Sequence, residues 1–147
     1  MEKTYHIAIT SKVIQLSEIM QYLNDPSHGA QVLFFGVVRN LNVGRSVLAV
    51  EYDVHPLLAE SAMSKICEDA IQKWDKIKIV LIHRVGRLAV GEASVAIAVT
   101  SPHRREAYEA SRYLIDHLKH QAPIWKKEFY ETGESEWLEG HALCDAH

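Results

Sequence analysis

The sequence contains little cysteine, no long apolar run and no excess of positive charge. Its two cysteines, Cys67 and Cys144, lie far apart and form no Cys-x-x-Cys pair, which excludes a disulfide framework and a four-cysteine zinc site. Apolar stretches such as Val95 to Val99 are far shorter than the roughly 20 residues that a membrane helix needs. The polar start of the chain lacks a signal-peptide core, so we expect a cytoplasmic protein in a reducing compartment.

Charge and length narrow the class of protein further. Sixteen Lys and Arg stand against nineteen Asp and Glu, so the net charge of -3 provides no global positive field for a nucleic-acid backbone. The 147 residues, 48% of them apolar, match one globular domain. Because there is no repeat or low-complexity linker, we expect a single domain over 1–147. Its ordered unit runs from Thr4 to Leu138, with a weakly ordered tail after about residue 138.

The N-terminal half of the chain predicts three strands and two helices. We expect strands at Tyr5 to Ile9, Gln31 to Arg39 and Val47 to Val54, with Gly36 marking a bulge or a close backbone approach. A short helix is expected at Ser17 to Leu23, and a polar loop at Asn40 to Gly44. A long helix opens at His55-Pro56, and its predicted apolar stripe is Leu58, Ala62, Met63, Ile66, Cys67, Ala70, Ile71 and Trp74.

The C-terminal half predicts two hairpins around a helix. Strands at Ile77 to His83 and Ala93 to Thr100 are expected to form a hairpin around Val90-Gly91-Glu92. A helix follows, with Ser101 as N-cap, Pro102 at the first helical position and its end at Pro123, and its predicted buried stripe is Ala107, Ala110, Leu114, Ile115 and Leu118. Strands at Ile124 to Tyr130 and Ser135 to Leu138 close the chain as a final hairpin. The order of elements indicates an α+β fold with a mixed or mainly antiparallel sheet and flanking helices.

A local cationic patch lies between Thr100 and Tyr130. This segment has six Lys and Arg against four Asp and Glu, a formal +2, while the rest of the chain carries -5. Such a patch on an acidic protein suits a small anion better than a long polyanion, although a solvated helix face gives the same count. His103 and Arg104 at a helix start oppose the usual preference for acids there, and a bound phosphate or carboxylate would explain them. The alternative is that both side chains face water or pair with acids elsewhere.

Lys119 and the pair Lys126-Lys127 flank a short turn that precedes Trp125. A lysine beside a second cation and shielded by Trp125 would be a better proton-transfer group or nucleophile near neutral pH. The ordinary alternative is that a lysine in a last helical turn complements the helix dipole. His103 and Lys119 are sixteen residues apart, or about 24 Å along one helix, so we predict that a twofold dimer brings these two groups together.

Metal and cysteine chemistry have little support in the sequence. His117 and His120, at i and i+3, lack a third ligand at a recognisable spacing, so we expect no metal site. Cys67 lies on an apolar helix stripe, and Cys144 has no evident base or helix terminus to activate it. We expect no cofactor, because no dinucleotide or phosphate-loop fingerprint is present.

Several motifs in order resemble the catalytic large subunit of molybdopterin synthase. The resemblance covers about Val32 to Trp137 and rests on Phe35-Gly36-Val37-Val38-Arg39-Asn40, Glu51-Tyr52, Ile82-His83-Arg84-Val85-Gly86, Val90-Gly91-Glu92, Ser101-Pro102-His103-Arg104-Arg105-Glu106-Ala107, Leu118-Lys119 and Ala122-Pro123-Ile124-Trp125-Lys126-Lys127-Glu128. It implies an alpha/beta hammerhead-like fold. It also implies a sulfurtransferase that converts cyclic pyranopterin monophosphate (precursor Z) to molybdopterin. The sulfur donor would be the C-terminal Gly-Gly thiocarboxylate of a small ubiquitin-like subunit, in a heterotetramer built on a homodimer of this chain.

The resemblance also implies roles for individual residues. Lys119 and Lys126 would carry catalysis. The substrate-binding residues would be Val37, Val38, Arg39, His103, Arg104, Lys127 and Glu128, with His103 and Arg104 supplied by the neighbouring subunit. Two other functions stay open from the residues alone. One is a small-anion, RNA or nucleotide-binding module that uses the 100–130 patch, and the other is a persulfide sulfurtransferase that uses Cys67 or Cys144.

Overall fold

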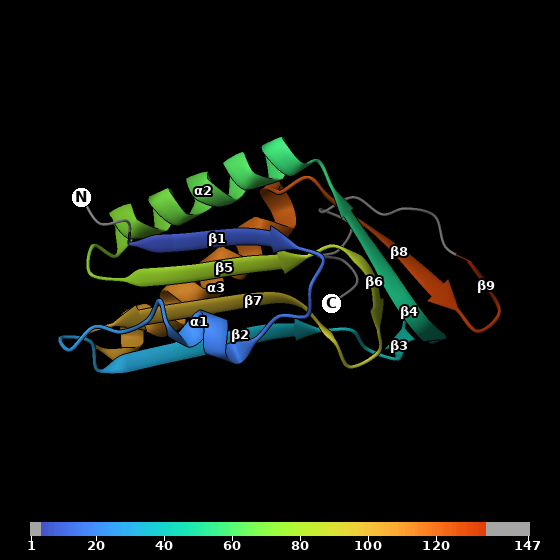
Figure 1. Cartoon of the computed structure of the whole chain (residues 1–147), viewed down its shortest axis with the longest axis horizontal. Helices are drawn as coiled ribbons and strands as arrows, with labels where there is room; N and C mark the ends of the chain where they lie inside the picture. The colour runs from blue at the N-terminus through green and yellow to red at the C-terminus, as the bar shows by residue number, and fades with distance from the viewer. Residues whose placement is uncertain (1–3, 135–147) are drawn as a thin grey trace.

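Four strands form a mixed sheet that runs along the length of the molecule (Figure 1). The computed structural model describes residues 4–134. The sheet has the order β1 (Tyr5–Thr10), β5 (Lys78–Arg84), β7 (Ala93–Ser101) and β2 (Ala30–Val37). β1 and β5 are parallel, and the other two pairs are antiparallel. β5 and β7 are the central strands and are buried on both faces, which explains why their sequences are nearly continuous apolar runs.

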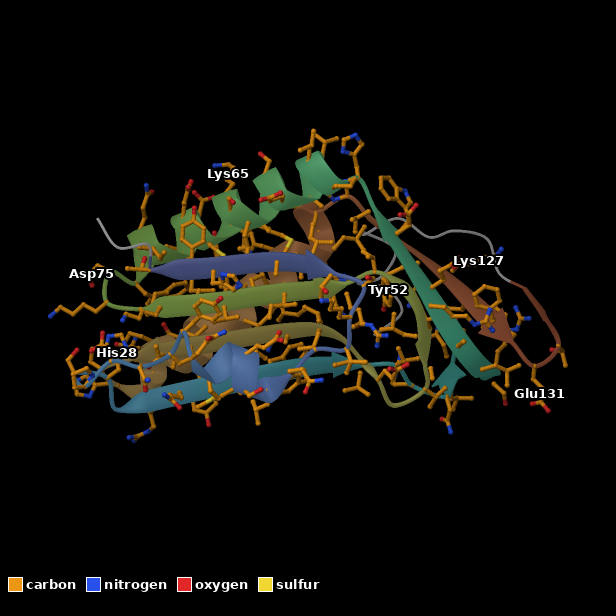
Figure 2. The ribbon with its side chains drawn as sticks, in the orientation of Figure 1. His28, Tyr52, Lys65, Asp75, Lys127 and Glu131 are labelled. Carbon is orange, nitrogen blue, oxygen red and sulfur yellow. The ribbon has the colours of Figure 1, made fainter. Side chains whose placement is uncertain are left out.

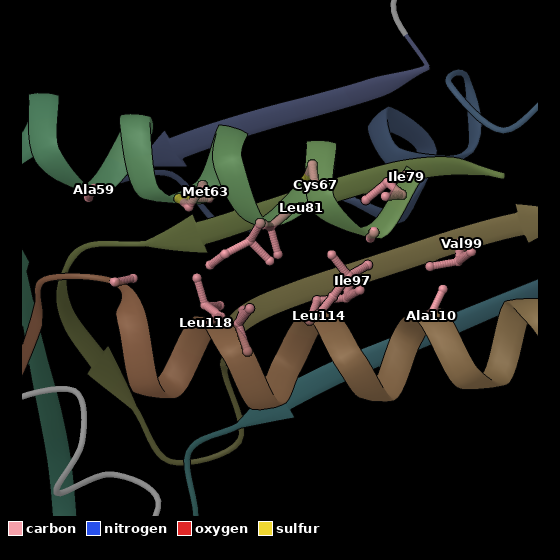
Figure 3. Close-up of a cluster of buried hydrophobic side chains, with 14 of the residues drawn as sticks. Ala59, Met63, Cys67, Ile79, Leu81, Ile97, Val99, Ala110, Leu114 and Leu118 are labelled. Atoms are coloured by element: carbon pink, nitrogen blue, oxygen red, sulfur yellow. The ribbon is translucent and has the colours of Figure 1, made fainter. Parts of the chain in front are cut away.

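Two long helices cover one face of this sheet and one short helix covers part of the other. α2 (Pro56–Lys73) and α3 (Arg104–Gln121) pack on β5 and β7, with side chains from both helices and both strands meeting in one core (Figure 3). On the opposite face, α1 (Leu16–Met20) contributes Ile19 to a smaller cluster with Val80 and Ala98. The buried residues of α3 include Ala107, Ala110, Leu114 and Leu118, as the helical periodicity predicts.

A second, antiparallel sheet stands across one end of the first (Figure 1). Its long strand β4 (Arg45–Val54) pairs with β8 (Ile124–Tyr130), β6 (Gly86–Ala89) and β3 (Leu41–Asn42), and β9 (Gly133–Glu134) extends β8. The architecture is therefore α+β with a mixed and an antiparallel sheet, as predicted. Because β8 follows α3 directly, the end of that helix lies at the junction of the two sheets.

Both expectations for Gly36 are confirmed. The register of β2 against β7 shifts between Gly36 and Val37, which is the irregularity that a bulge produces. A Cβ added at Gly36 would lie 2.6 Å from Cγ1 of Val95, so the backbone approaches its neighbour too closely for any side chain. The glycine thus brings β2 tightly against β7 at the end of the sheet where β4 begins.

Several predicted boundaries are wrong. Ser101 is the last residue of β7, where it pairs with Ala30, so His103 rather than Ser101 is the N-cap of α3. β5 and β7 pair antiparallel as the expected hairpin requires, but the connection between them contains β6, whose buried Leu88 pairs with β4. Leu58 is 58% exposed, and the buried stripe of α2 begins one residue later, at Ala59.

Smaller differences concern the loops. The predicted loop at Asn40 to Gly44 contains β3, and the helix predicted at Ser17 to Leu23 is the five-residue α1. β9 occupies part of the expected final turn, while the strand predicted at Ser135 to Leu138 and the tail after residue 138 lie outside the described residues. None of the helices between residues 4 and 134 has the length and apolar character to cross a membrane.

Candidate functional site

A cavity of about 70 Å³ lies where the two sheets meet the end of α3. Residues from both sheets and from α3 line it: Phe34, Gly36, Val37, Tyr52, His83, Ser94, Val95, Ile115, Leu118, Lys119 and Ile124. Most of this wall is apolar, and the polar groups are a phenol, an imidazole, a hydroxyl and one lysine. A small apolar recess with a few convergent polar groups is the usual form of a binding or catalytic site.

Lys119 provides the ammonium group of this wall. It lies in the last turn of α3, one helical turn after Ile115 and next to Leu118, and both of these residues also line the cavity. Lys119 is half-buried. The structure therefore places the first of the two predicted catalytic lysines in the wall of a partly open cavity at the end of α3.

Lys126 is buried on β8 and forms an ion pair with Glu128, with Nζ 2.9 Å from Oε1. Oε1 of Glu128 also accepts a hydrogen bond from Asn42 Nδ2 at 2.7 Å. Burial alone would raise the pKa of Glu128, but the bonds from Asn42, Lys126 and Tyr130 together lower it below its ordinary value. Glu128 is thus a carboxylate under neutral conditions.

This geometry corrects the expectation that Lys126 and Lys127 act as neighbouring cations. Successive residues of a strand point to opposite faces, so Lys126 is buried beside Glu128 while half-buried Lys127 lies over the ring of Phe129, 5.4 Å from its centroid. The partner of Lys126 is an anion, not a second ammonium. Lys126 shares its face with Tyr52, its neighbour in the β4–β8 register, and Tyr52 lines the cavity.

Tyr52 on β4, labelled in Figure 2, and Ser94 on β7 bring the two sheets together at the cavity. The Tyr52 hydroxyl hydrogen-bonds the side chain of Ser94, whose Oγ donates to the carbonyl of Gly36 at 3.2 Å. Burial raises the pKa of Tyr52 and the charge of Glu128 adds to the shift, while the bond to Ser94 opposes it. The phenol is therefore held as a neutral group between the cavity and the buried ion pair.

His83 is the imidazole of the cavity wall and is 4% exposed. Its Nδ1 lies 2.8 Å from the backbone carbonyl of Arg84, and its ring packs against Tyr52 with the centroids 5.1 Å apart. Burial lowers the pKa of His83 to about 4, against the effect of its backbone hydrogen bond. The ring is neutral at physiological pH.

The start of α3 is a separate, exposed feature. His103 and Arg104 are exposed, and His103 caps the helix without a side-chain hydrogen bond. α3 is continuous from Arg104 to Gln121, so its length keeps these residues far from Lys119 within one chain. The chain alone therefore does not bring the two predicted clusters together, and their meeting in a dimer stays a prediction.

The other predicted binding residues lie around β2 and β8. Val37 lines the cavity and is 48% exposed. Val38 is buried beside Val47 and Leu88, and its backbone N–H and C=O bond to Glu92 and Gly91. Arg39 is exposed at the end of β2. Contact of these residues with a ligand stays a prediction.

Within the described residues, the histidines form no metal site and the cysteine forms no nucleophilic site. Residues 4–134 hold no group of three or more His, Cys, Asp or Glu placed to bind a metal ion. Nδ1 of His117 and of His120 each bond the carbonyl four residues earlier in α3. Cys67 is fully buried, and burial raises the pKa of its thiol to about 12, so it is no nucleophile near neutral pH. Cys144 lies outside the described residues.

Comparison with known proteins decides the family. The family model described as MoaE protein matches residues 9–121. The chain belongs to the MoaE family. A molybdopterin synthase catalytic subunit from Synechococcus elongatus is 40% identical over 141 residues, which cover 95% of this chain and 86% of the relative. This member of the MoaE family is thus the catalytic subunit of a molybdopterin synthase, an enzyme of molybdenum cofactor biosynthesis.

Solved structures agree with the MoaE assignment. The crystal structure of molybdopterin synthase from Staphylococcus aureus matches with a TM-score of 0.83 and 34% identity, and the match covers 94% of this chain and 98% of that one. A structure described as a protein-protein complex of subunits 1 and 2 of molybdopterin-converting factor from Helicobacter pylori has a TM-score of 0.69. Its identity is 20%, over 90% of this chain and 88% of that one, so it supports the fold alone.

Three polar residues of the cavity wall were not predicted as site residues: Tyr52, His83 and Ser94. For His83 and Ser94 the signal in the sequence is a polar side chain beside an otherwise apolar run, whereas Tyr52, between Glu51 and Asp53, carries no such signal. His83 ends the run Ile79 to Ile82, and Ser94 opens the run Val95 to Val99. A polar residue in such a run needs a hydrogen-bond partner or faces a cavity, and that rule would have selected these positions.

Proposed function

We propose that this chain converts precursor Z to molybdopterin, taking sulfur from the C-terminal thiocarboxylate of a small ubiquitin-like subunit. The observation that carries the proposal is the position of Lys119 in a small, mainly apolar cavity within a MoaE-family fold. A volume of about 70 Å³ suits the end of a Gly-Gly tail, because glycines have no side chains to oppose entry. The family assignment favours this enzyme over an anion- or RNA-binding module.

Lys119 stabilises the charge that develops during sulfur transfer. The thiocarboxylate sulfur adds to a carbonyl carbon of the substrate side chain, and the electron pair of the C=O bond moves to oxygen, where an ammonium group stabilises the charge and supplies a proton. The protonated oxygen leaves as water, and a second water cleaves the acyl–sulfur bond, which releases the carrier as its carboxylate and leaves the sulfur on the substrate. Lys126 acts beside it as a cation held in place by Glu128. The ion pair fixes the lysine on the face of β8 that it shares with Tyr52.

Substrate binding completes the proposal. Arg39, His103 and Arg104 hold the phosphate and pterin, with His103 and Arg104 reaching the site from the neighbouring subunit of a dimer. The free N–H groups and positive dipole end of α3, together with the Arg104 guanidinium, suit a phosphate. Val37 contributes from the cavity wall, and Val38, Lys127 and Glu128 contribute to substrate binding through backbone or side chain.

An external sulfur donor agrees with the state of Cys67, whose buried thiol is protonated near neutral pH. The relatives of about 40% identity are themselves named catalytic subunits, which supports an assembly with a second subunit. We place the reaction in the cytoplasm, where two chains of this protein and two small subunits form the active heterotetramer.

The test is a reconstituted reaction. The purified chain is incubated with precursor Z and a thiocarboxylated ubiquitin-like carrier, and the dithiolene product is quantified. Lys119→Ala is expected to lower turnover by about 10²–10⁴-fold. Lys65→Ala serves as control, because Lys65 is an exposed α2 lysine paired with Asp69 and its loss is expected to leave turnover unchanged. Near-normal turnover by Lys119→Ala contradicts the role given to this lysine.

A further inference from the structure

His83 presents a defined hydrogen-bond acceptor to the cavity. A backbone carbonyl only accepts, so the 2.8 Å contact with Arg84 requires Nδ1 of His83 to carry the proton. In the neutral ring the other nitrogen, Nε2, then has a lone pair and no hydrogen. The tautomer is therefore set by the local backbone, independently of any ligand.

The acceptor has no protein partner in the described part of the chain. Within residues 4–134 the His83 ring makes one hydrogen bond, through Nδ1, and one ring contact, with the edge or face of Tyr52. The Tyr52 hydroxyl is engaged with Ser94, and Ser94 donates to Gly36. The neighbouring polar groups of the wall thus bond one another, and Nε2 can accept a hydrogen bond from a molecule in the cavity.

Nε2 is not among the fully enclosed polar atoms without a partner in residues 4–134, so it stays accessible to a molecule in the cavity. A donor there stabilises the arrangement, and a ligand that covers Nε2 without a donor loses about 1–3 kcal/mol. Water fills that role in a small polar recess until a ligand enters. A ligand that displaces the water and brings an N–H or O–H group keeps the bond, and one without a donor loses it.

We propose that Nε2 of His83 accepts a hydrogen bond from an N–H or O–H group of the ligand that enters the Lys119 cavity, which makes His83 a binding and specificity residue of this site. The inference rests on the proposed function for the identity of the ligand. Two sources of the donor are then available: the ring N–H groups of the pterin, and the backbone N–H groups of the carrier's Gly-Gly tail. In both, His83 selects for a donor directly beside the Lys119 ammonium.

Two substitutions at His83 distinguish the roles of the two ring nitrogens. In His83→Asn the amide reaches the position of Nδ1, so it keeps the bond to the Arg84 carbonyl and loses the acceptor in the cavity. In His83→Gln the longer side chain carries an oxygen to the position of Nε2 and restores the acceptor. We expect His83→Asn to raise KM by about 10-fold for the ligand that donates the bond, and His83→Gln to lie closer to wild type.

Measuring KM separately for precursor Z and for the thiocarboxylated carrier identifies the source of the donor. A rise for precursor Z alone assigns the pterin, and a rise for the carrier alone assigns the tail. Equal KM values for wild type and His83→Asn towards both ligands overturn the proposal. A wild-type chain that forms no dithiolene contradicts the proposed function instead.

A second measurement does not depend on the variants folding. The ¹⁵N resonances of the histidine rings are followed in the wild-type chain during titration with precursor Z and, separately, with the carrier in its ordinary carboxylate form. Nε2 of His83 is expected to shift with one of them, while Nδ1 of His83 stays constant. His6, which lies on the edge strand β1 that contributes no residue to the cavity wall and stacks its ring on Tyr22, is the internal control. Absence of any shift at Nε2 with both bound ligands overturns the proposal.

Discussion

Lys126 and Glu128 form the most enclosed ion pair among the described residues, with side-chain exposures of 5% and 2%. Two charges at such depth cost desolvation free energy that their attraction offsets only when the geometry is good and the other polar atoms are bonded. Oε1 of Glu128 bonds both Lys126 and Asn42, and these contacts keep the carboxylate charged beside the lysine. The pair therefore fixes a lysine inside the protein at a defined position.

Glu128→Gln is expected to destabilise the protein by about 3–5 kcal/mol, because it leaves the buried Lys126 ammonium without its counter-charge. Since the folded-state pKa of Glu128 lies below its ordinary value of 4.5, its carboxylate stabilises the fold above that pH and loses this effect as the pH falls through the lower folded value. Urea unfolding at pH 7 and at pH 3 measures both effects. The difference between wild type and variant is expected to shrink at the lower pH.

The double variant Lys126→Met/Glu128→Leu is the control for the charge argument. It removes both charges and keeps apolar volume, so it is expected to be more stable than Glu128→Gln alone. Equal stability of the two variants would mean that packing, not the unpaired charge, causes the loss.

Gly36→Ala is expected to destabilise the fold by about 1–3 kcal/mol, because the new methyl group would collide with Cγ1 of Val95. A Val95→Ala substitution removes the obstructing atom, so the double variant is expected to lose less stability than the sum of the two single changes. Thermal unfolding of the four proteins completes the cycle. Strict additivity would show that the close approach of β2 and β7 is not the cause.

At this scale the sequence predicts apolar positions better than polar ones. Gly36 and Cys67 behave as their patterns indicate, since a glycine in a strand and a cysteine on a helix stripe each have one common role. His83 does not, because the hydrogen bond to the Arg84 carbonyl that fixes its tautomer depends on the local backbone geometry. The partner of Lys126 was missed because alternation on β8 separates it from Lys127 and directs it to Glu128.

At the scale of helices and strands, the N-terminus of α3 lacks a side-chain cap. The N-cap His103 has extended backbone angles and makes no side-chain cap bond, and Glu106 already stands at the third helical position. A residue that accepts from the first-turn N–H groups would satisfy this helix start better. The choice of histidine here is consistent with selection for binding at the expense of stability.

His103→Ser is expected to raise stability by about 1 kcal/mol while lowering dithiolene formation. The serine and Glu106 would form a reciprocal capping box, whereas the proposed ligand contact of the imidazole is lost. His55→Ser is the matched control, because His55 already caps α2 by accepting from the Leu58 N–H at 3.3 Å. Thermal unfolding is expected to shift for the first variant and to change little for the second.

Element type follows from the sequence more readily than element boundaries. α2 and α3 are long and periodic, and β5 and β7 are apolar runs, so local pattern alone predicts them. The four-residue β6 was missed because its one buried side chain, Leu88, gains its environment from β4, far away in the chain. The start of α3 was misplaced because pairing with Ala30 keeps Ser101 in β7.

For the whole molecule, the length of α3 separates the exposed helix start from Lys119, and the proposed dimer is what joins them. Mixing the variants His103→Ala and Lys119→Ala tests this arrangement. Each variant alone is expected to be inactive, whereas random exchange of subunits gives mixed dimers with one intact site and restores about a quarter of wild-type activity. No recovery after verified subunit exchange would place both groups in the same chain's site.

The cavity around Lys119 draws its wall from β2, β4, β5, β7, α3 and β8, between Phe34 and Ile124. These contributions are distant in the chain, so the recess takes shape only after both sheets have paired and α3 has docked on them. A ribosome-bound chain that stops before β8 consequently contains Lys119 without the complete wall of the cavity. The chain thus becomes catalytically competent late in folding, only after β8 has paired with β4.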